Sequence, residues 1–546
     1  MRRITLLTLF LLSLVRVSAQ DVIEIVYNGS TATVNLNGIT DVVPTVNGAN
    51  VTITSKTTTK EYTYQVKGAS ADGSLTINGD YKLMLQLAGV TLTNAHGGAA
   101  IDVECGKRIA VELADGTINT LTDAADGEQK AAFYFKGHVE FKGSGTLNVT
   151  GKTKHAISAK EYIELKSSLG TINVLGAVSD GIHCGKGKVN NENNYFRMKG
   201  GIVNITNVGG DGIDSDDYGV VKIEGGTLSL NITDDASGLK ADSTVTITDG
   251  KINISVMGND SKGIRASHTV NIMGGKTTLI VDGKGSKGIK TKRNESGSTV
   301  LNGGFLNISG GKLSIQCNGG NLSTESSITK CVAVSVDADL KQTDGDVYIT
   351  VFDEATAYTL GSETYQGSES HTGGTFIIRQ VPWKIQTRDY QYDMTVYATV
   401  SANDIMLTDY NDIAVGAFID DECVGYGIFE EEGYGVIRIR SNDNSAHPVT
   451  FKLYHFSDRS EYVLIPNQTV TFQSDTNVGE PSNPIMLSCS MKLEGDANDD
   501  GEVNVADVDY VIESIGEDVE THKSADVNDD GEINVADVDY IIERIV

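Results

Sequence analysis

The sequence predicts a mainly β protein built from a parallel β-helix, then a β-sandwich, then a small α-helical module. Three observations predict this order. A small residue followed by an apolar one recurs every 24 to 32 residues between Ala100 and Ile289. No proline lies between Pro44 and Pro382. Two nearly identical twelve-residue segments rich in aspartate occupy the last fifty residues.

The chain begins with the features of a secretory signal peptide. Arg2 and Arg3 precede an apolar run from Ile4 to Val15, and Val17-Ser18-Ala19 fits a cleavage site. The apolar run is too short to span a bilayer. We therefore expect residues 1–19 to be removed, no transmembrane segment to follow, and the protein to be secreted or held at the cell surface by a partner.

The net charge and the spacing of the cysteines limit the kinds of partner and metal site that the chain can have. The formal net charge is −29, which makes nucleic acid an unsuitable partner. Six cysteines are scattered without the spacing of a metal site, and Cys317 with Cys331 is the closest candidate pair for a disulfide.

The long stretch without proline indicates strands that are hydrogen-bonded on both sides, because proline cannot donate to a ladder. Several units contain a glycine pair and an alternating strand, as in GGIVNI (200–205) and GGKLSI (310–315). A repeat near 25 residues with short strands and glycine turns is typical of a parallel β-helix. We expect residues 20–90 to cap its N-terminal end and residues 91–375 to form it. The expected inward ladder consists of Ile101, Phe133, Ile157, Ile182, Ile213, Leu239, Ile264 and Ile289.

Residues 60–370 resemble a family of carbohydrate-binding right-handed β-helices from polysaccharide-degrading bacteria. The resemblance rests on AIDVECGKRIAVELADGTINTLTD (100–123), on VGGDGIDSDDYGVVKIEGGTLSL (208–230) and on repeated DGI and KGI turns. It implies a right-handed fold similar to that of pectate lyases, bound calcium, and binding of acidic sugars such as polygalacturonate, or of cellulose.

A column of charged residues follows the apolar ladder. If the ladder points inward, the next residue of each unit points outward, and successive coils stack about 4.8 Å apart. Stacked cations at that spacing repel one another, so a linear polyanion such as an acidic polysaccharide would stabilise them. The alternative is a solvated face balanced by Asp242 and Asp282. The outward row reads His183, Asp214, Lys240, Arg265 and Lys290, and Lys262 and Lys287 lie beside it.

Tyrosine is the aromatic residue available for sugar stacking, because the expected solenoid contains no tryptophan. Tyr218, beside several aspartates, is the best candidate. The predicted carbohydrate-binding residues are therefore Tyr218, Lys240, Lys262, Arg265, Lys287 and Lys290.

Aspartates are dense in two adjacent turns of the same region. Carboxylates in such numbers suit a hard cation, and a bound calcium ion could bridge to a uronate. The alternative is that these are ordinary turn aspartates. The candidate calcium ligands are Asp180, Asp211, Asp214, Asp216, Asp217 and Asp235, with Asp234 beside the last.

The sequence favours a non-catalytic binding protein over an enzyme. Calcium-dependent pectate lyases use an arginine or lysine base, and Lys240 or Arg265 could take that role if the pKa of the side chain were depressed. No Ser/His/Asp signature or carboxylate pair at a motif spacing is present. A polysaccharide lyase is the first alternative, and a surface or adhesion structural protein is the second.

Proline returns after Pro382, together with Trp383, and strand-like runs such as MTVYATV (394–400) and VTFKLYH (449–455) follow. Their spacing predicts a β-sandwich over residues 376–490. The stretches NDIAVGAF (411–418) and DDEC (420–423) resemble an accessory sandwich module of secreted bacterial proteins, a resemblance that implies no activity.

The two aspartate-rich segments, Asp496–Asp507 and Asp526–Asp537, match twelve-residue calcium loops. Such loops use positions 1, 3, 5, 7, 9 and 12 as ligands and glycine at position 6. Gly501 and Gly531 fill position 6, and Glu502 and Glu532 offer a backbone carbonyl. The predicted ligands are Asp496, Asn498, Asp500, Glu502, Asn504 and Asp507, and Asp526, Asn528, Asp530, Glu532, Asn534 and Asp537.

Apolar residues at helical spacing follow each loop, so each unit is a loop and then a helix. Residues 491–546 thereby resemble a type I dockerin, which implies a cohesin domain of a scaffold protein as partner in a polysaccharide-degrading assembly. Loop positions 10 and 11, which would contact the cohesin, are Val505, Ala506, Val535 and Ala536. Because the pair is the same in both loops, we expect docking in two orientations. The alternative is a tail that binds calcium only for stability.

Overall fold

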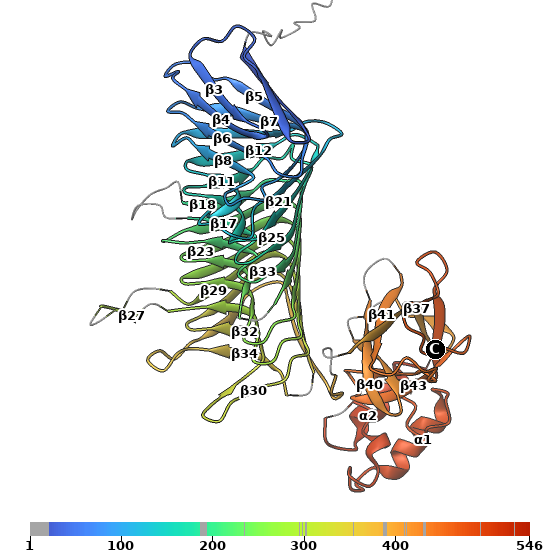
Figure 1. The fold of residues 1–546 in the computed structure, drawn as a ribbon. Helices are drawn as coiled ribbons and strands as arrows, with labels where there is room; N and C mark the ends of the chain where they lie inside the picture. Colours follow the sequence, from blue (N-terminus) through green and yellow to red (C-terminus); the bar gives the residue numbers. More distant parts are fainter. Residues whose placement is uncertain are drawn as a thin grey trace, which may run out of the picture. The chain divides into compact units, whose positions relative to one another are not determined.

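The computed structural model describes residues 21–545, with gaps at 186–193, 234, 294, 297–298, 301–302, 353, 386–389, 409, 411, 430–432, 492 and 529. The chain divides into two compact units, Met1–Lys384 and Ile385–Val546. The predicted signal peptide lies outside the described residues. The structure is mainly β, as predicted, with two short α-helices near the C-terminus (Figure 1).

Two hairpins begin the first unit. Strand β1 (Val22–Asn28) pairs antiparallel with β2 (Thr31–Asn35), and β3 (Val42–Asn47) pairs antiparallel with β4 (Asn50–Ser55). Parallel stacking starts immediately after them, because β5 (Thr63–Ser70) pairs in parallel with β1. The stacked coils therefore start well before the boundary at residue 90 that the repeat suggested. Ser74-Leu75 already occupies the position of the repeat in an earlier coil, because Leu75 is fully buried and pairs with Ile101 of the ladder.

A 13-stranded sheet forms one wall of the solenoid, and its strands beyond the hairpin pair in parallel with the next coil (Figure 1). Its remaining strands are β6 (Ser74–Asn78), β8 (Ile101–Glu104), β11 (Ala131–Phe135), β14 (His155–Ala159), β17 (Ile182–Cys184), β20 (Ile213–Ser215), β22 (Ser237–Ala241), β24 (Lys262–Ala266), β26 (Lys287–Thr291), β32 (Val332–Val336) and β34 (Thr356–Leu360).

The predicted inward ladder is confirmed. Its eight members, from Ile101 to Ile289, are paired coil to coil and at most 1% exposed. Burial of each such side chain contributes about 1.5–3 kcal/mol. The position before each ladder residue is sterically restricted, which explains the small residue there. At Gly238, for example, an added Cβ would lie 2.5 Å from the carbonyl oxygen of Gly263 on the next coil.

A 19-stranded sheet contains most of the remaining strands of the solenoid. It contains β1, β2, β5, β7 (Leu83–Thr93), β9 (Arg108–Leu113), β10 (Ile118–Thr122), β12 (His138–Lys142), β13 (Thr146–Gly151), β15 (Ile163–Leu165), β16 (Thr171–Ala177), β18 (Tyr195–Met198), β19 (Ile202–Val208), β21 (Val220–Ile232), β23 (Thr244–Val256), β25 (Thr269–Val281), β29 (Phe305–Cys317), β33 (Leu340–Phe352), β35 (Glu369–His371) and β36 (Thr375–Val381).

The glycine pairs of the repeat lie inside the longest of these strands. At Gly226, Gly275 and Gly311 the backbone has φ of +87°, +71° and +77°, a region that favours glycine. The register between neighbouring strands shifts at the same places. The glycines therefore let one long strand bend around a corner of the coil.

Two small hairpins interrupt the repeat after residue 291, and the stacking then continues. The hairpins are β27 (Glu295–Ser296) with β28 (Thr299–Val300) and β30 (Leu322–Ser323) with β31 (Ile328–Thr329). Strand β33 pairs in parallel with β29 and with β36, so stacked strands extend to Val381. Stacking thus continues well beyond Ile289, the last member of the predicted ladder.

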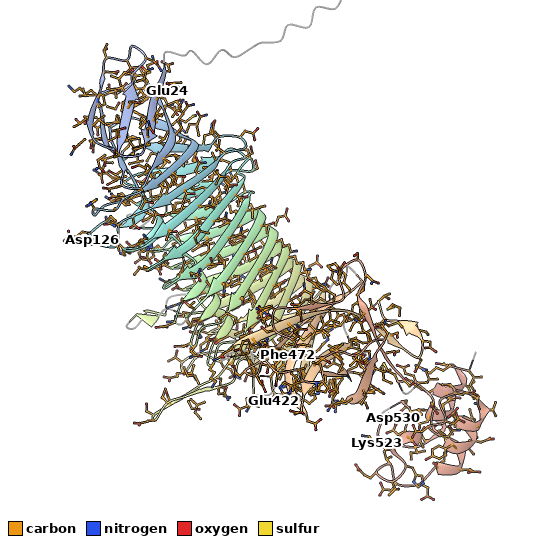
Figure 2. The ribbon with its side chains drawn as sticks, turned by 45° about the vertical axis from the view of Figure 1, so that its right-hand side comes forward. Glu24, Asp126, Glu422, Phe472, Lys523 and Asp530 are labelled. Atoms are coloured by element: carbon orange, nitrogen blue, oxygen red, sulfur yellow. The ribbon has the colours of Figure 1, made fainter. Side chains whose placement is uncertain are left out.

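The predicted β-sandwich of residues 376–490 is wrong. Strand β37 pairs with β41 along its first half and with β45 along its second half, so one sheet closes on itself instead of two sheets packing face to face. Phe451 and Phe472 lie in its core, fully buried (Phe472 is labelled in Figure 2). Its strands are β37 (Tyr392–Ala402), β38 (Ile405–Met406), β39 (Ile413–Ile419), β40 (Glu422–Phe429), β41 (Gly435–Ser441), β42 (Thr450–His455), β43 (Ser460–Pro466), β44 (Asn477–Val478) and β45 (Ile485–Cys489).

The C-terminal module contains α1 (Val505–Ser514), a short 3₁₀ helix η2 (Lys523–Ala525) and α2 (Val535–Ile542). The predicted loop-then-helix units are confirmed. Their small core consists of Ala497, Val511, Ala525, Ile533 and Ile541. No helix among the described residues is long and apolar enough to cross a membrane.

Candidate calcium loops and a charged face of the solenoid

The first residue of each aspartate-rich loop organises the turn that follows it. The carboxylate of Asp496 accepts hydrogen bonds from the backbone N–H groups of Asp500 at 3.1 Å and Gly501 at 2.9 Å. Asp526 accepts the same two bonds, at the same lengths, from Asp530 and Gly531 in the second loop (Asp530 is labelled in Figure 2). The two loops therefore have the same local structure.

The last residue of each loop fastens the loop to its helix. Asp507 is fully buried, and its carboxylate accepts the backbone N–H groups of Asn498 at 3.1 Å and Asn504 at 2.8 Å. The Asn504 side chain caps α1 by accepting the N–H of Ala506 at 2.7 Å. Asp537, also fully buried, and Asn534 repeat this arrangement at α2.

The donor set of each loop fits calcium. The side chains at positions 1, 3, 5 and 12 supply only carboxylate and amide oxygens, which a hard cation prefers. In the described part of both loops, no lysine, arginine or histidine forms an ion pair with the aspartates at positions 1, 5 and 12. Gly501 and Gly531 have φ of +88° and +86°, which the sharp turn at position 6 requires.

The residues at positions 10 and 11 are on the surface at the start of each helix. Val505 and Val535 are each 63% exposed, and Ala506 and Ala536 are exposed as well. Ile512 and Ile542, among the apolar residues at helical spacing, are 52% and 54% exposed. Each helix thus presents the same apolar residues to solvent.

In the solenoid, the outward column of charged residues exists as the sequence predicted. Parallel pairing places His183 beside Asp214, Asp214 beside Lys240, Lys240 beside Arg265, and Arg265 beside Lys290. A second outward column, two residues before the apolar ladder, pairs Lys262 with Lys287. We call Lys262, Arg265, Lys287, Lys290 and Lys292 the cationic stripe.

Most of the stripe is recessed and incompletely neutralised. The side chains of Lys262, Lys287 and Lys290 are 15%, 14% and 19% exposed. Lys262 and Lys287 share one carboxylate, that of Asp260, at 3.3 and 3.5 Å. Lys290 pairs with Asp337 at 2.5 Å. The sequence did not single out these two counter-ions, because they lie in turns between coils.

Arg265 has no hydrogen-bond or ion-pair partner among the described residues. Burial lowers the pKa of Lys287, and the neighbouring Lys262 and Lys290 lower it further against the opposing effect of Asp260. Burial also lowers the pKa of Lys292, together with Arg265 and Lys290. The stripe therefore holds cations whose charged forms are destabilised by one another.

At the other end of the column, Lys240 lies among three carboxylates. Its ammonium nitrogen is 3.0 Å from Asp211, 3.1 Å from Asp214 and 3.7 Å from Asp216. Burial alone would lower the pKa of Lys240, but Asp211 and Asp214 raise it well above its ordinary value. A lysine held in this way stays protonated at neutral pH.

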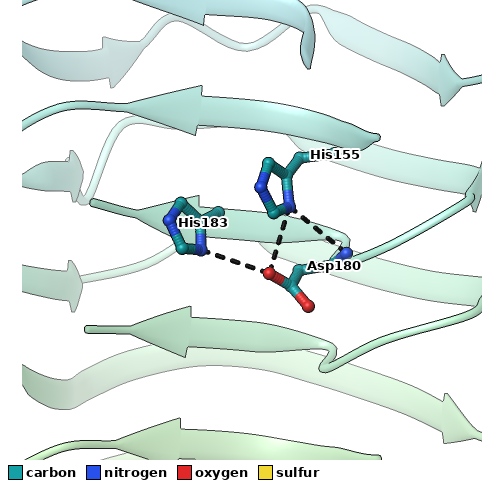
Figure 3. A group of neighbouring side chains, drawn as sticks. All are labelled: His155, Asp180 and His183. Atoms are coloured by element: carbon teal, nitrogen blue, oxygen red, sulfur yellow. Dashed lines mark hydrogen bonds and ion pairs between the residues drawn. The ribbon is translucent and has the colours of Figure 1, made fainter. Parts of the chain in front are cut away.

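Next to Lys240, Asp180 lies between two histidines (Figure 3). Its Oδ2 is 3.0 Å from Nδ1 of His155 and 3.1 Å from Nδ1 of His183. The imidazole rings stack with centroids 4.2 Å apart and planes 8° apart. Burial lowers the pKa of His183, but hydrogen bonds to Asp180 and Asp214 outweigh it and raise the pKa to about 9.

His155 was not foreseen from the sequence, although its position two residues before Ile157 in the second outward column could have revealed it. Among the described residues, the groups of close metal-binding side chains are His155–Asp180–His183, His183–Asp214–Asp216 and Asp180–Asp211–Asp214. Asp217 and Asp235, which were predicted with them, belong to none of these groups. Asp234 lies outside the described residues.

Tyr218 follows the cluster in a tight turn. Asp217 and Tyr218 both have positive φ, +50° and +66°, and the side chain of Asn194 donates to the carbonyl oxygens of Asp216 and Asp217 at 2.6 and 2.7 Å. Tyr218 is 68% exposed. The turn therefore presents one aromatic ring to solvent beside the carboxylates.

Comparison with known proteins finds matches for the solenoid and for the C-terminal module. A family described as carbohydrate-binding domain-containing proteins matches residues 47–279, and the type I dockerin domain matches residues 494–546. The chain carries a type I dockerin domain behind a region that is similar to the carbohydrate-binding-domain family. The dockerin domain coincides with the calcium loops and helices α1 and α2, and the carbohydrate-binding-domain region covers most of the solenoid, including Lys240 and Arg265.

A curated carbohydrate-binding domain-containing protein of Acetivibrio thermocellus is 30% identical over 139 residues, which is 24% of this chain and 48% of that protein. The chain thus matches about half of that relative. A solved polysaccharide lyase-like protein from C. thermocellum aligns over 65% of this chain and 99% of its own, with 18% identity and a TM-score of 0.29. A chain from a type II cohesin–X-dockerin complex of Acetivibrio cellulolyticus aligns over 28% and 94%, with 17% identity and a TM-score of 0.13.

Proposed function

We propose that this protein is an exported, non-catalytic polysaccharide-binding component that docks through its dockerin domain onto a cohesin of a scaffold protein. We take the solenoid to be a right-handed β-helix, because crossover connections between parallel strands are right-handed. This solenoid binds an acidic polysaccharide of the pectin type. The dockerin domain holds calcium in its two loops.

The cationic stripe is the observation that carries the glycan assignment. Its cations lie in register on two successive coils, Lys262 beside Lys287 and Arg265 beside Lys290, about 4.8 Å apart along the solenoid axis. Asp260 and Asp337 provide fewer negative charges than the stripe has positive ones. A linear chain of uronates laid along the axis supplies the missing charge at each coil and relieves the repulsion that lowers the pKa values of Lys287 and Lys292.

Tyr218 supports a contact with sugar rings at the acidic end of the same face. It is exposed and held in a fixed turn, so its ring is available for stacking against a sugar at little entropic cost. One tyrosine is a small stacking surface, which favours an acidic polysaccharide over crystalline cellulose.

The surroundings of Lys240 support a non-catalytic role. Abstraction of a proton by a lysine requires the free amine, and a pKa near the working pH. Asp211 and Asp214 move the pKa of Lys240 in the opposite direction. The other candidate base, Arg265, would have to release a proton that a guanidinium holds strongly. The lyase alternative therefore depends on Arg265.

Docking is assigned to the exposed residues at the start of α1 and α2. Because Val505 and Val535 have the same exposure and the same neighbours, we infer that either helix can occupy the cohesin, related by a half-turn of the domain. A partner that binds this apolar pair needs an apolar patch of its own.

The experiment is affinity electrophoresis of the full chain through gels containing polygalacturonate, its methyl ester, or a soluble cellulose derivative. We expect retardation by polygalacturonate that decreases as salt rises, and little retardation by the other two. Equal retardation by the uncharged polymers would contradict the role of the stripe. Absorbance of unsaturated products in a parallel incubation with polygalacturonate and calcium would show a lyase instead.

A further inference from the structure

The group of His155, Asp180 and His183 has no role in the function proposed above. The three side chains come from two successive coils, His155 from β14 and Asp180 and His183 from the turn before β17 and from β17 itself. They are 4%, 9% and 16% exposed, so water has little access to them. Asp214, on β20 of the next coil, brings its Oδ2 to 3.5 Å from Nδ1 of His183.

The spacing of these donor atoms suits a tetrahedral metal ion. Bonds of about 2.0–2.1 Å at tetrahedral angles separate neighbouring ligand atoms by roughly 3.3 Å. Oδ2 of Asp180 is 3.0 Å from Nδ1 of His155 and 3.1 Å from Nδ1 of His183, and the three donor atoms all lie within 4.8 Å of one another. Small rotations of the two rings would direct their nitrogen lone pairs at one ion.

Two polar atoms in the group lack a satisfactory partner. Oδ1 of Asp214, a residue only 3% exposed, accepts no hydrogen bond in the described part of the chain. Nδ1 of His155 faces both the backbone N–H of Asp180, at 3.3 Å, and the carboxylate of Asp180. If this nitrogen carries a lone pair, it accepts the hydrogen bond from the N–H group but repels the carboxylate oxygen. A cation between the nitrogen and the oxygen would remove that repulsion.

The charge around the group also calls for a cation. Asp180, Asp211, Asp214 and Asp216 lie close together, and among the described residues Lys240 and His183 are the cationic side chains that pair with them, two against four carboxylates. A divalent ion would reduce the remaining negative charge. The nitrogen donors decide its class, because imidazole suits zinc and neighbouring transition metals, whereas calcium and magnesium prefer oxygen alone.

We propose that His155, Asp180 and His183 form a zinc-class metal site with three protein ligands that joins two consecutive coils of the solenoid. Surrounding groups hold the ligands in place. Oδ1 of Asp180 accepts the backbone N–H of Asp211 at 2.9 Å, and the carboxylate of Asp214 lies 3.5 Å from Nδ1 of His183. Such outer contacts orient metal ligands in known sites.

The test uses the full chain, stripped with EDTA and returned to millimolar calcium so that the dockerin loops are filled. Zinc is then added, unbound metal is removed by gel filtration, and zinc per chain is measured by elemental analysis. We expect about one zinc ion per chain, as for a single structural site. The same sample loaded with Co²⁺ should show the visible absorption of a tetrahedral site with nitrogen ligands.

The variant His155→Gln/His183→Gln should retain at least tenfold less zinc and lose the cobalt absorption, because loss of ligands exceeds the 10–100-fold effect of outer contacts. His96→Gln is the matched control, since His96 lies in the solenoid, pairs with Asp72 and has a side chain 79% exposed. The strand signal in circular dichroism checks that each variant is folded.

Retention of zinc by the folded double variant, or failure of the parent chain to retain zinc, would overturn the proposal. If the double variant does not fold, anomalous diffraction at the zinc edge from crystals of the parent chain decides the matter. A peak between His155 and His183 supports the site. A peak elsewhere, or no peak, would show that the group is only a hydrogen-bonded network and would refute the metal site.

Discussion

The ammonium nitrogen of Lys240 lies 3.1 Å from the carboxylate of Asp214, its pairing neighbour on the preceding coil. This contact divides the outward column in two. On one side, aspartates and histidines surround a neutralised lysine. On the other side, Arg265 and the lysines of the cationic stripe have too few counter-ions. A polyanion therefore gains most by binding beside Arg265, one coil beyond Lys240.

Replacing Lys240 with methionine should destabilise the solenoid, because the partly buried carboxylates of Asp211 and Asp214 lose a charged hydrogen-bond donor. We expect a decrease of about 1.5–3 kcal/mol in the free energy of unfolding, measured with urea. Lys284→Met, at an exposed lysine of a nearby coil, should change it by less than about 0.5 kcal/mol. Equal effects of the two substitutions would argue against a structural role for Lys240.

Removing calcium should unfold the dockerin domain and spare the solenoid. Without the ion, the carboxylates at positions 1, 5 and 12 repel one another, and metal binding is coupled to folding in small metal-binding domains. After addition of EDTA we expect helical circular dichroism to disappear and limited proteolysis to cleave within residues 494–546. A loss of the strand signal at the same EDTA concentration would show that calcium is needed elsewhere as well.

Inactivating one calcium loop should leave docking intact, and inactivating both should abolish it. Asp496→Ala disables the first loop and Asp526→Ala the second, while the helix of the other loop stays available. Binding to an immobilised cohesin is the measurement, once a partner cohesin is in hand. Complete loss of binding in one of the single variants would mean that only one orientation is used, contrary to the equal exposure of Val505 and Val535.

Cys317 and Cys331 should form a disulfide after export. Their Sγ atoms are 3.1 Å apart in the solenoid interior, and both residues are fully buried. Closing a loop of this length stabilises a protein by about 3 kcal/mol in the chain-entropy treatment. Alkylation under denaturing conditions should label four of the six cysteines without reductant and all six after reduction. Labelling of six cysteines without reductant would contradict the pairing.

Much of the solenoid could be predicted because each coil repeats one rule. Gly238 admits no Cβ, and the ladder residue after it must be apolar, so period and inward face are visible in the sequence. The calcium loops were predictable for a similar reason, since their ligands lie within twelve consecutive residues. In both cases the decisive interactions involve residues at fixed sequence separations.

Other features depend on contacts between residues whose separation along the sequence is not fixed. Closure of the sheet in the second unit results from β37 reaching both β41 and β45, and the spacing of strands along the chain does not reveal such a partner. Asp260 and Asp337 neutralise part of the stripe from turns of variable length. His155 joins Asp180 across coils in a column that the apolar ladder does not mark.

The central claim is that the cationic stripe binds an acidic polysaccharide, and calorimetric titration of the full chain with polygalacturonate tests it most directly. The variant is Lys262→Gln/Arg265→Gln/Lys287→Gln, and Lys107→Gln/Lys160→Gln, at exposed lysines of earlier coils, is the matched control. We predict that the control binds like the parent chain and that the triple variant binds at least tenfold more weakly. It should also show a smaller decrease of affinity with salt. Parent-like affinity in the folded triple variant would contradict the account.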